Sequence, residues 1–319
     1  MTTLITTVPA ALAEALRSAD IDPVRLTARF GDRRVSAGSP AELRGKLASA
    51  LYDMLHVGRD KPGGQRPRDH QDEDFESRLR SVVPHAHTLA PASIVDHSPA
   101  TGIATVELAG VRVRLPVSGT PRAGQHVLLK VDCVRPRLSP GFLLVEGSAG
   151  NGLGDGPILR VYMHLADARH AVRLWSAVLG RLELLAVPYR AKITSTRAGL
   201  PRRDGLVIYL GPRAWHAARE VAAAVADLPG LGRSISLYAS PLGPGVATAW
   251  EPDDSRAGFR GRSFGEHRSL AIATGLLAHA QDPSICLEAR LTAALTAANI
   301  VAGRPSHNTT SPSLPDITS

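Results

Sequence analysis

The sequence predicts an α+β protein with a largely antiparallel sheet, and three patterns support this class. Short apolar runs separated by turns, such as ATVELAG and HVLLKVDCV within residues 93–147, predict antiparallel strands. Leucines at every fourth position from Leu43 to Leu55 predict an amphipathic helix. From residue 158 to residue 301, strand and helix patterns alternate. We therefore expect a largely antiparallel sheet with helices in the C-terminal half, preceded by a smaller helical and β-rich N-terminal region.

The individual elements follow from periodicity and from capping signals. Ser39 and Pro40 mark one helix start, and Ser263 with Glu266 forms a capping box at another. The expected helices cover residues 8–19, 39–56, 167–181, 213–227, 264–280 and 284–301. The expected strands of the second half cover residues 158–165, 187–194, 206–210 and 234–239, and residues 240–254 are expected to form a loop rich in proline and glycine.

Composition also suggests where the chain divides. The run NGLGDGP at 151–157 lacks the spacing of nucleotide-binding loops, so we interpret it as a linker. It would join an N-terminal region, residues 1–150, to an α+β domain, residues 151–302. Residues 59–74 are polar and rich in proline and glycine, which predicts a mobile loop. Residues 303–319 are expected to form a disordered tail.

The charge of the chain predicts an anionic partner. Its 319 residues carry a formal net charge of +8, which favours nucleic acid, a phosphorylated substrate or an acidic peptide. Cys133 and Cys286 form no Cys/His cluster, so we expect no zinc site, no disulfide framework and a cytoplasmic protein. No apolar window is long enough to cross a membrane, and the N-terminus does not look like a signal peptide.

A cationic pair occupies the start of the helix expected at 264–280. His267 and Arg268 lie near the positive end of its dipole, on a helix whose apolar composition predicts burial. Such an arrangement is unfavourable unless an anion binds there. The alternative is that both side chains reach solvent or pair with a local carboxylate.

Further basic residues fall on the expected strands. On residues 158–165, the period of two places Arg160, Tyr162 and His164 on one face. That face could be the floor of a site, or the solvent-exposed face of an edge strand. On the next strand Lys192 shares a face with Arg190, although most lysines are simply solvated.

Arg202 and Arg203 precede the apolar strand at 206–210, and Asp204 could hold one of them in place. Together these elements offer a lysine, a histidine and several arginines, without the carboxylates that a metal site needs. This set suits the elimination of phosphate from phosphoserine or phosphothreonine. A base removes the Cα proton, an acid assists the leaving phosphate, and arginines neutralise its charge. A lysine base needs nearby cations or burial.

The quoted motifs resemble those of the HopA-type effector family. They are SFGEHRSL, RVYMHL, VPYRAKI, RRDGLVIYL and VRPRLSPGFLLVEG, and the resemblance extends from about residue 39 to residue 300. In lanthipeptide and thioamitide biosynthesis this family supplies the lyase. The resemblance therefore implies a phosphoserine/phosphothreonine lyase that converts a precursor peptide, phosphorylated by a separate Ser/Thr kinase, into one containing dehydroalanine and dehydrobutyrine. It implies no cofactor, and it suggests that residues 1–150 dock the peptide or the kinase.

A more remote similarity to the phosphothreonine lyases implies roles for individual residues. Carried over by motif, Lys192 is the base and His164 the acid, while Arg203, Arg268 and Arg160 bind phosphate. The supporting residues are Tyr162, Arg202 and His267. Those lyases have a basic residue two positions before the histidine, where this chain has Tyr162.

The sequence leaves one other function open and argues against a second. A non-catalytic, effector-like protein could use the same basic residues only to capture a phosphorylated or acidic partner. Nucleic-acid binding rests on net charge alone, because the chain offers no aromatic stacking platform and no recognised motif. We therefore expect no nucleic-acid partner.

Overall fold

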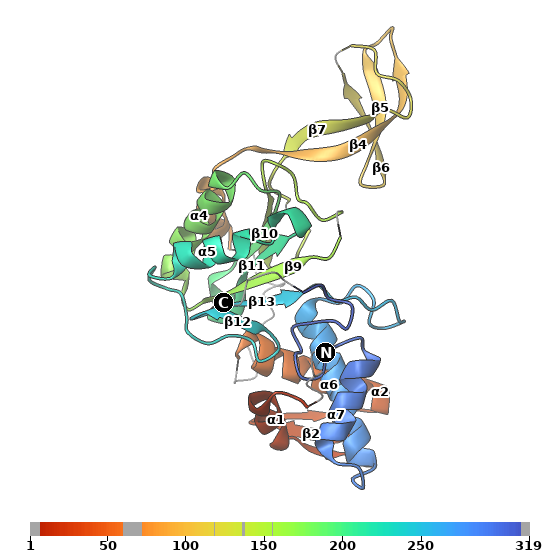
Figure 1. Ribbon diagram of the computed structural model, residues 1–319, viewed down its shortest axis with the longest axis vertical. Helices are drawn as coiled ribbons and strands as arrows, with labels where there is room; N and C mark the ends of the chain where they lie inside the picture. Colours follow the sequence, from red (N-terminus) through yellow and green to blue (C-terminus); the bar gives the residue numbers. More distant parts are fainter. Residues whose placement is uncertain (1–6, 60–71, 118, 136–137, 155, 314–319) are drawn as a thin grey trace.

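The computed structural model describes residues 7–59, 72–117, 119–135, 138–154 and 156–313. It confirms an α+β protein in which every described strand pairing is antiparallel. Figure 1 shows three layers of structure along the long axis: a projecting small sheet, a central sheet with helices, and a helical unit at the other end.

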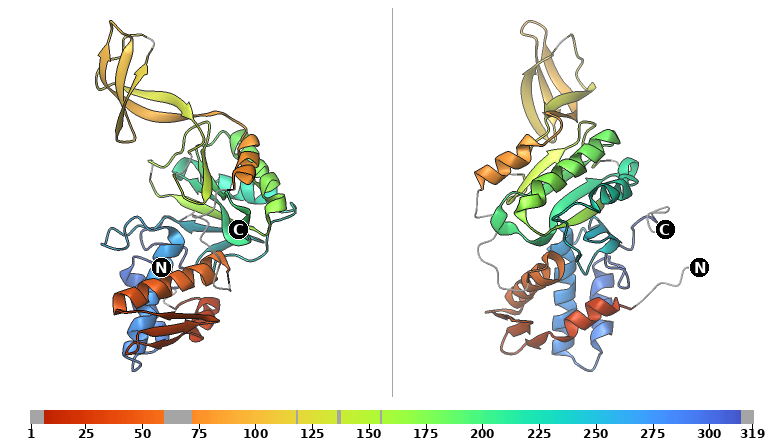
Figure 2. Two further views of the ribbon diagram at one scale, coloured as in Figure 1. Left: turned by 180° about the vertical axis from the view of Figure 1, so that it is seen from behind. Right: turned by 90° about the vertical axis from the view of Figure 1, so that its left-hand side faces the viewer.

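A six-stranded antiparallel sheet forms the centre of the molecule. Its strand order is β12-β13-β9-β11-β10-β8. The strands are β8 (Phe142–Glu146), β9 (Leu159–Leu165), β10 (Arg190–Thr194), β11 (Arg202–Leu210), β12 (Ser240–Gly243) and β13 (Val246–Trp250). Helices α4 (Ala168–Leu184) and α5 (Ala217–Val225) cover one face, as Figure 2 shows, and α3 (Glu73–Ser81) contacts α4. Residues such as Trp175 and Val161 form an apolar core there. The opposite face carries Arg160 and Lys192 beside Val207, which belongs to a second core.

The helical unit combines both ends of the chain. Its N-terminal part contains α1 (Ala10–Arg17), β1 (Asp20–Asp22), β2 (Thr27–Phe30), β3 (Arg33–Ser36), α2 (Pro40–Leu51) and the π-helix η1 (Tyr52–Val57). Its C-terminal part contains α6 (Phe264–Gln281) and α7 (Leu287–Ala297). Leu43 and Leu47 of α2 are fully buried with Ile272 of α6, so segments more than 200 residues apart share one core.

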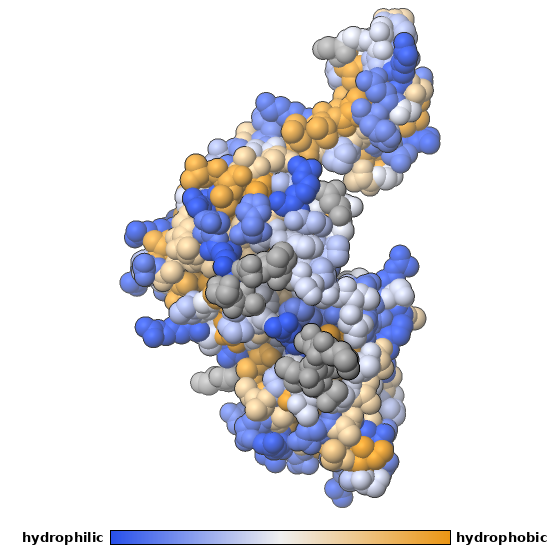
Figure 3. Space-filling model, in the orientation of Figure 1, coloured by the Kyte–Doolittle hydropathy of each residue, from blue (hydrophilic) through white to orange (hydrophobic). Residues whose placement is uncertain are grey.

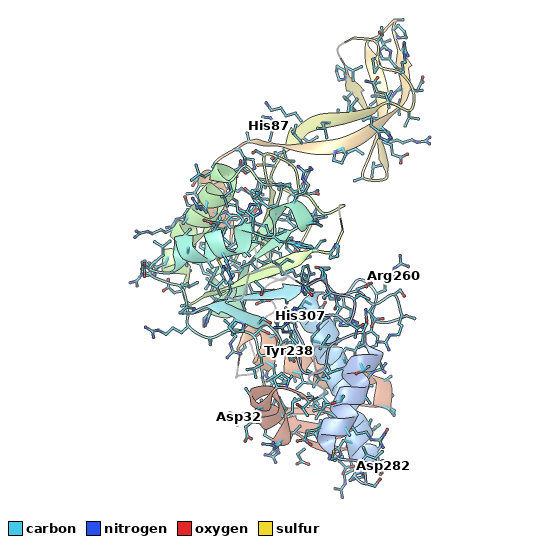
Figure 4. The ribbon with its side chains drawn as sticks, in the orientation of Figure 1. Asp32, His87, Tyr238, Arg260, Asp282 and His307 are labelled. Atoms are coloured by element: carbon cyan, nitrogen blue, oxygen red, sulfur yellow. The ribbon has the colours of Figure 1, made fainter. Side chains whose placement is uncertain are left out.

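The projecting sheet has the strand order β6-β5-β4-β7. Its strands are β4 (His87–Ser98), β5 (Ile103–Leu108), β6 (Val111–Pro116) and β7 (His126–Asp132). Ile94, Ala104 and Val106 form its small buried cluster, and hydrophobic side chains remain on its surface (Figure 3). Figure 4 places His87 where this sheet leaves the rest of the molecule.

The structure corrects several local predictions. Residues 234–239 form a turn rather than a strand, and β12 and β13 lie within the expected loop at 240–254. Residues 303–313 are ordered: Ser306 and Asn308 are buried, and the amide of Trp250 donates to the carbonyl of Ser306. The tail prediction is therefore wrong for this part, because hydrogen bonds join it to Trp250, Glu251 and Arg268. Of the loop expected at 59–74, residues 60–71 lie outside the described residues, and α3 begins at Glu73.

No helix in the described part of the chain is long and apolar enough to cross a membrane.

Candidate functional site

The polar face of the central sheet carries the candidate site. Strand β9 lies between β13 and β11, so its face with Arg160 and Tyr162 does not belong to an edge strand. Tyr162 pairs in register with Val207 of β11, and Val207 pairs with Lys192 of β10. The three residues form one row across the sheet, because paired antiparallel residues present their side chains on the same face.

A cavity of about 640 Å³ lies over this row. The sheet supplies its floor, while the end of α2, η1 and the first turn of α6 supply its walls. Among the described residues, six cations line the cavity: Arg33, Arg59, Arg160, Lys192, Arg202 and Arg262. Three described carboxylates line it: Asp53, Asp204 and Glu266. The described lining therefore has a formal charge of +3 and favours an anionic ligand.

Local partners neutralise only part of this charge. Arg33 donates to Asp53 at 2.7 Å, and Arg160 is paired with Glu251 beside the cavity. Arg59 donates to the carbonyl of Gly199 at 2.6 Å, and burial together with Arg202 lowers its pKa. Within the described residues, Lys192, Arg59 and Arg262 have no carboxylate partner.

Lys192 has aromatic neighbours in place of a counter-ion. Its Nζ lies 4.4 Å from the centre of the Phe142 ring and 5.9 Å from that of Tyr209. These cation–π contacts orient the ammonium group without neutralising it. Lys192 therefore remains available to an anion in the cavity.

A buried ion pair supports the floor of the cavity. The guanidinium of Arg202 makes two hydrogen bonds to Asp204, at 2.7 and 2.8 Å, and both residues are about 95% buried. Burial opposes the charge of Asp204, but Arg202 outweighs it and holds the pKa of this carboxyl well below its usual range. The hydroxyl of Tyr52 donates to the same carboxylate at 3.3 Å. Asp204 thus fixes Arg202, as the sequence suggested, and ties the sheet to η1.

His56 is a cavity residue that the sequence analysis missed. It lies on η1, its Nδ1 is 2.8 Å from the Ser236 hydroxyl, and its Nε2 is 3.8 Å from Asp204. Burial lowers the pKa of His56 to about 4, so the ring is neutral at neutral pH. A signal was present, because Tyr52 and His56 are four residues apart beside the leucine stripe of α2 and so share one helix face.

The start of α6 approaches η1 closely at a glycine. A Cβ on Gly265 would lie 2.3 Å from Cδ2 of His56 and 2.7 Å from a ring carbon of Tyr52. The capping box of Ser263 and Glu266 is present and fixes where this helix begins. Glycine at position 265 therefore allows the wall of the cavity to close against His56.

Tyr162 and Arg160 act together on the cavity floor. Nη1 of Arg160 donates to the Tyr162 hydroxyl at 3.3 Å, so the phenol receives a hydrogen bond and keeps its own proton for another acceptor. Burial raises the pKa of Tyr162 although Arg160 opposes this effect, and the phenol is protonated at neutral pH. Tyr162 thus offers the cavity a hydrogen-bond donor.

The structure places two other predicted residues outside the described lining of this cavity. Nδ1 of His164 lies 3.0 Å from the carbonyl of Ser234, and Arg203 donates to the Ser234 hydroxyl and to the carbonyls of Met54 and Leu55. Burial lowers the pKa of His164. His164 does share the β9 face with Tyr162, but it packs against the 232–234 turn instead of facing the cavity.

Arg268 and His267 also lie away from the described cavity lining. Arg268 is fully buried and donates to the Pro305 carbonyl at 2.9 Å and to Oδ1 of Asn308 at 2.7 Å. His267 lies between Asp254, 3.1 Å from its Nε2, and Arg268. The predicted anion at this helix start is therefore replaced by a local carboxylate for His267 and by tail oxygens for Arg268. Both residues join α6 to neighbouring loops.

Among the described residues, no group of three or more His, Cys, Asp or Glu side chains is arranged to hold a metal ion.

The fold and the cavity define an α+β protein with a cation-rich cavity over one face of its central sheet. The chain belongs to the HopA1 effector protein family, whose model matches residues 133–306. This confirms the family resemblance. The match contains the whole central sheet and α6, whereas η1 precedes it.

Two solved effector structures from Pseudomonas syringae are similar to this chain. The effector from pathovar tomato strain DC3000 is 13% identical, with a TM-score of 0.46, over 86% of this chain and 91% of that one. The effector from pathovar syringae strain 61 is 10% identical, with a TM-score of 0.44, over 83% of this chain and 94% of that one. No curated protein matches the sequence.

Proposed function

We propose that the protein is a phosphoserine/phosphothreonine lyase that eliminates phosphate from a phosphorylated peptide. The observation that carries the proposal is Lys192, a cation without a carboxylate partner among the described residues, lining a cavity with a formal charge of +3. Such a cavity attracts a phosphorylated side chain and places an amine beside it.

The elimination needs one base and a stabilised leaving group. In its neutral form, Lys192 removes the Cα proton, and the electrons of that C–H bond form the Cα–Cβ double bond. The Cβ–O bond breaks, and its electrons leave with the phosphate. The products are a dehydroalanine or dehydrobutyrine residue, inorganic phosphate and a protonated lysine, which returns its proton to solvent.

Arginines on the floor and wall of the cavity would hold the phosphate. Arg202 is fixed by Asp204, Arg160 is fixed by Glu251, and Arg59 has only a carbonyl partner among the described residues. Guanidinium groups that are already positioned stabilise charge on the leaving group at little reorganisation cost. Because His164 lies away from the described lining, we assign the hydrogen bond to the leaving oxygen to Tyr162 in place of the histidine expected from the motif.

The proposal includes the origin of the substrate. A separate Ser/Thr kinase of the same pathway would phosphorylate the precursor peptide, as in lanthipeptide biosynthesis with the family members that this sequence resembles. The test therefore uses a synthetic phosphoserine peptide, so that its outcome does not depend on that kinase.

The experiment measures loss of phosphoric acid from the peptide by mass spectrometry. We expect elimination by the wild type and none by Lys192→Ala, while Lys130→Ala, an exposed lysine on β7, serves as the matched control. Elimination by Lys192→Ala at the wild-type rate would refute the assignment of the base. If the wild type binds the phosphopeptide and never eliminates phosphate, the non-catalytic binding function is correct instead.

A further inference from the structure

A second cavity adjoins the candidate site. It has a volume of about 550 Å³ and lies between β3 and the exposed side of α2. We call it the α2 groove, and its lining residues are Arg33, Arg34, Val35, Glu42, Gly45, Lys46, Ser49 and Ala50. Arg33, Gly45 and Ser49 also line the candidate site. The two cavities therefore meet at the same three residues.

The α2 groove is basic. Its described lining contains three cations, Arg33, Arg34 and Lys46, and one carboxylate, Glu42. Nζ of Lys46 lies 2.7 Å from Oε1 of Glu42, and the amide of Gly38 donates to Oε2 at 2.7 Å. Lys46 is thus paired with Glu42 and Arg33 with Asp53, so Arg34 is the lining cation without a carboxylate partner among the described residues. The hydrogen bond from Lys46 lowers the pKa of Glu42. Arg34 is exposed, so its guanidinium can reach a ligand in the groove.

Gly45 marks the passage between the cavities. It lies in the middle of α2, where glycine costs about 1 kcal/mol relative to alanine. A Cβ there would meet nothing within 4 Å, so no neighbouring atom in the described structure requires a glycine. Its absent side chain does lower the rim that the two cavities share. A peptide that places one residue in the candidate site can continue across this rim.

We propose that the α2 groove binds acidic residues that flank the phosphorylated residue of the peptide substrate. This inference rests on the proposed function for the identity of the ligand. The phosphate occupies the candidate site, and neighbouring Asp or Glu side chains lie against Arg34, beside the Lys46–Glu42 pair. The groove thus gives the protein a preference for phosphorylated residues in an acidic sequence context.

The test compares two synthetic phosphoserine peptides that differ only in having acidic or neutral flanking residues. Fluorescence anisotropy at low ionic strength measures the dissociation constant of each, because screening weakens exposed charge pairs. We expect the wild type to bind the acidic peptide more tightly. Arg34→Glu should weaken that binding by about threefold to tenfold, the range of one or two exposed charge contacts, and leave the neutral peptide unchanged.

Arg44→Glu is the matched control, since Arg44 is an exposed arginine of α2 outside the described groove lining. It should leave the binding of both peptides unchanged. Gly45→Phe should reduce the preference for the acidic peptide by filling the shared rim, with a thermal melt to confirm that the variant is folded.

The outcomes for the groove and for the lyase are separate. Three results would refute the proposal that the α2 groove binds acidic residues. They are equal binding of both peptides by the wild type, binding of neither peptide, and an equal loss of affinity for both peptides in Arg34→Glu. If the wild type prefers the acidic peptide and Arg34→Glu lacks that preference, but phosphate is never eliminated, then the α2 groove binds acidic residues and the protein is not a lyase.

Discussion

Replacing Asp204 by asparagine tests the support of the cavity floor most directly. The substitution keeps the shape of the side chain but removes the charge that faces Arg202. Both residues are about 95% buried and joined by two hydrogen bonds, so solvent screens the lost charge very little. Leaving one buried member of such a pair without its partner costs about 3–5 kcal/mol. We expect Asp204→Asn to lower the free energy of unfolding by that amount.

Urea denaturation measures the loss, and an exposed pair provides the control. Asp20 lies 3.5 Å from Arg29 with both side chains more than half exposed, so Asp20→Asn should cost less than about 1 kcal/mol. In a double-mutant cycle, Arg202→Met combined with Asp204→Asn should cost less than the sum of the single variants. A cost for Asp204→Asn no greater than that of Asp20→Asn would refute the reasoning.

The contribution of the Arg202–Asp204 pair to stability should depend on pH. The pKa of Asp204 is lower in the folded protein than in the unfolded chain, so its contribution to stability is complete above the unfolded value of about 3.9. It is lost as the pH falls from there toward the folded value. The difference in stability between wild type and Asp204→Asn should therefore be constant from pH 5 to 7 and shrink below about pH 4.

Three further predictions follow from the cavity walls and α6. Gly265→Ala should lower the free energy of unfolding in urea by about 1–3 kcal/mol, because the added methyl group would overlap His56. Gly180→Ala, at an open position of α4, should instead raise it by about 1 kcal/mol. Equal effects of the two substitutions would contradict the close approach of Gly265 to His56. Arg268→Met should lower the melting temperature, because it removes the hydrogen bonds to Pro305 and Asn308, and should leave the dissociation constant of a phosphopeptide unchanged. Weaker phosphopeptide binding by the folded variant would show that Arg268 contacts the ligand. The pKa of His56 is about 4 in the folded protein and about 6.5 in the unfolded chain, so the wild type should lose stability as the pH falls between these values. His56→Gln should reduce the slope of unfolding free energy against pH by up to about 1.4 kcal/mol per pH unit. An unchanged slope would show that His56 is not buried and neutral.

Local patterns in the sequence predicted a large part of the fold. The period of two on β9 correctly placed Arg160 and Tyr162 on one face, and the capping box at Ser263 correctly placed the start of α6. These features depend on residues two to four positions apart, which the sequence displays directly. The strand expected at 234–239 was wrong because apolar composition does not distinguish a strand from a turn that packs under other elements.

The composition of the cavity was harder to predict. Lys192, Arg160, Tyr162 and Arg202 come from the central sheet, but His56 reaches the cavity from a helix more than 100 residues earlier in the chain than Arg160. No local pattern reports which distant element will pack over a strand.

The sequence by itself determined which side chains share a strand face and that the chain carries an excess of cations. Only the tertiary structure decided which of those cations line a cavity without a carboxylate partner among the described residues. Arg268 is bonded to tail oxygens, Arg202 is paired with Asp204, and the ammonium group of Lys192 contacts aromatic rings and makes no ion pair with a described carboxylate. The physical reason is that a charged side chain is stabilised by whichever partner the fold brings within a few ångströms, and these partners come from segments far apart in the chain.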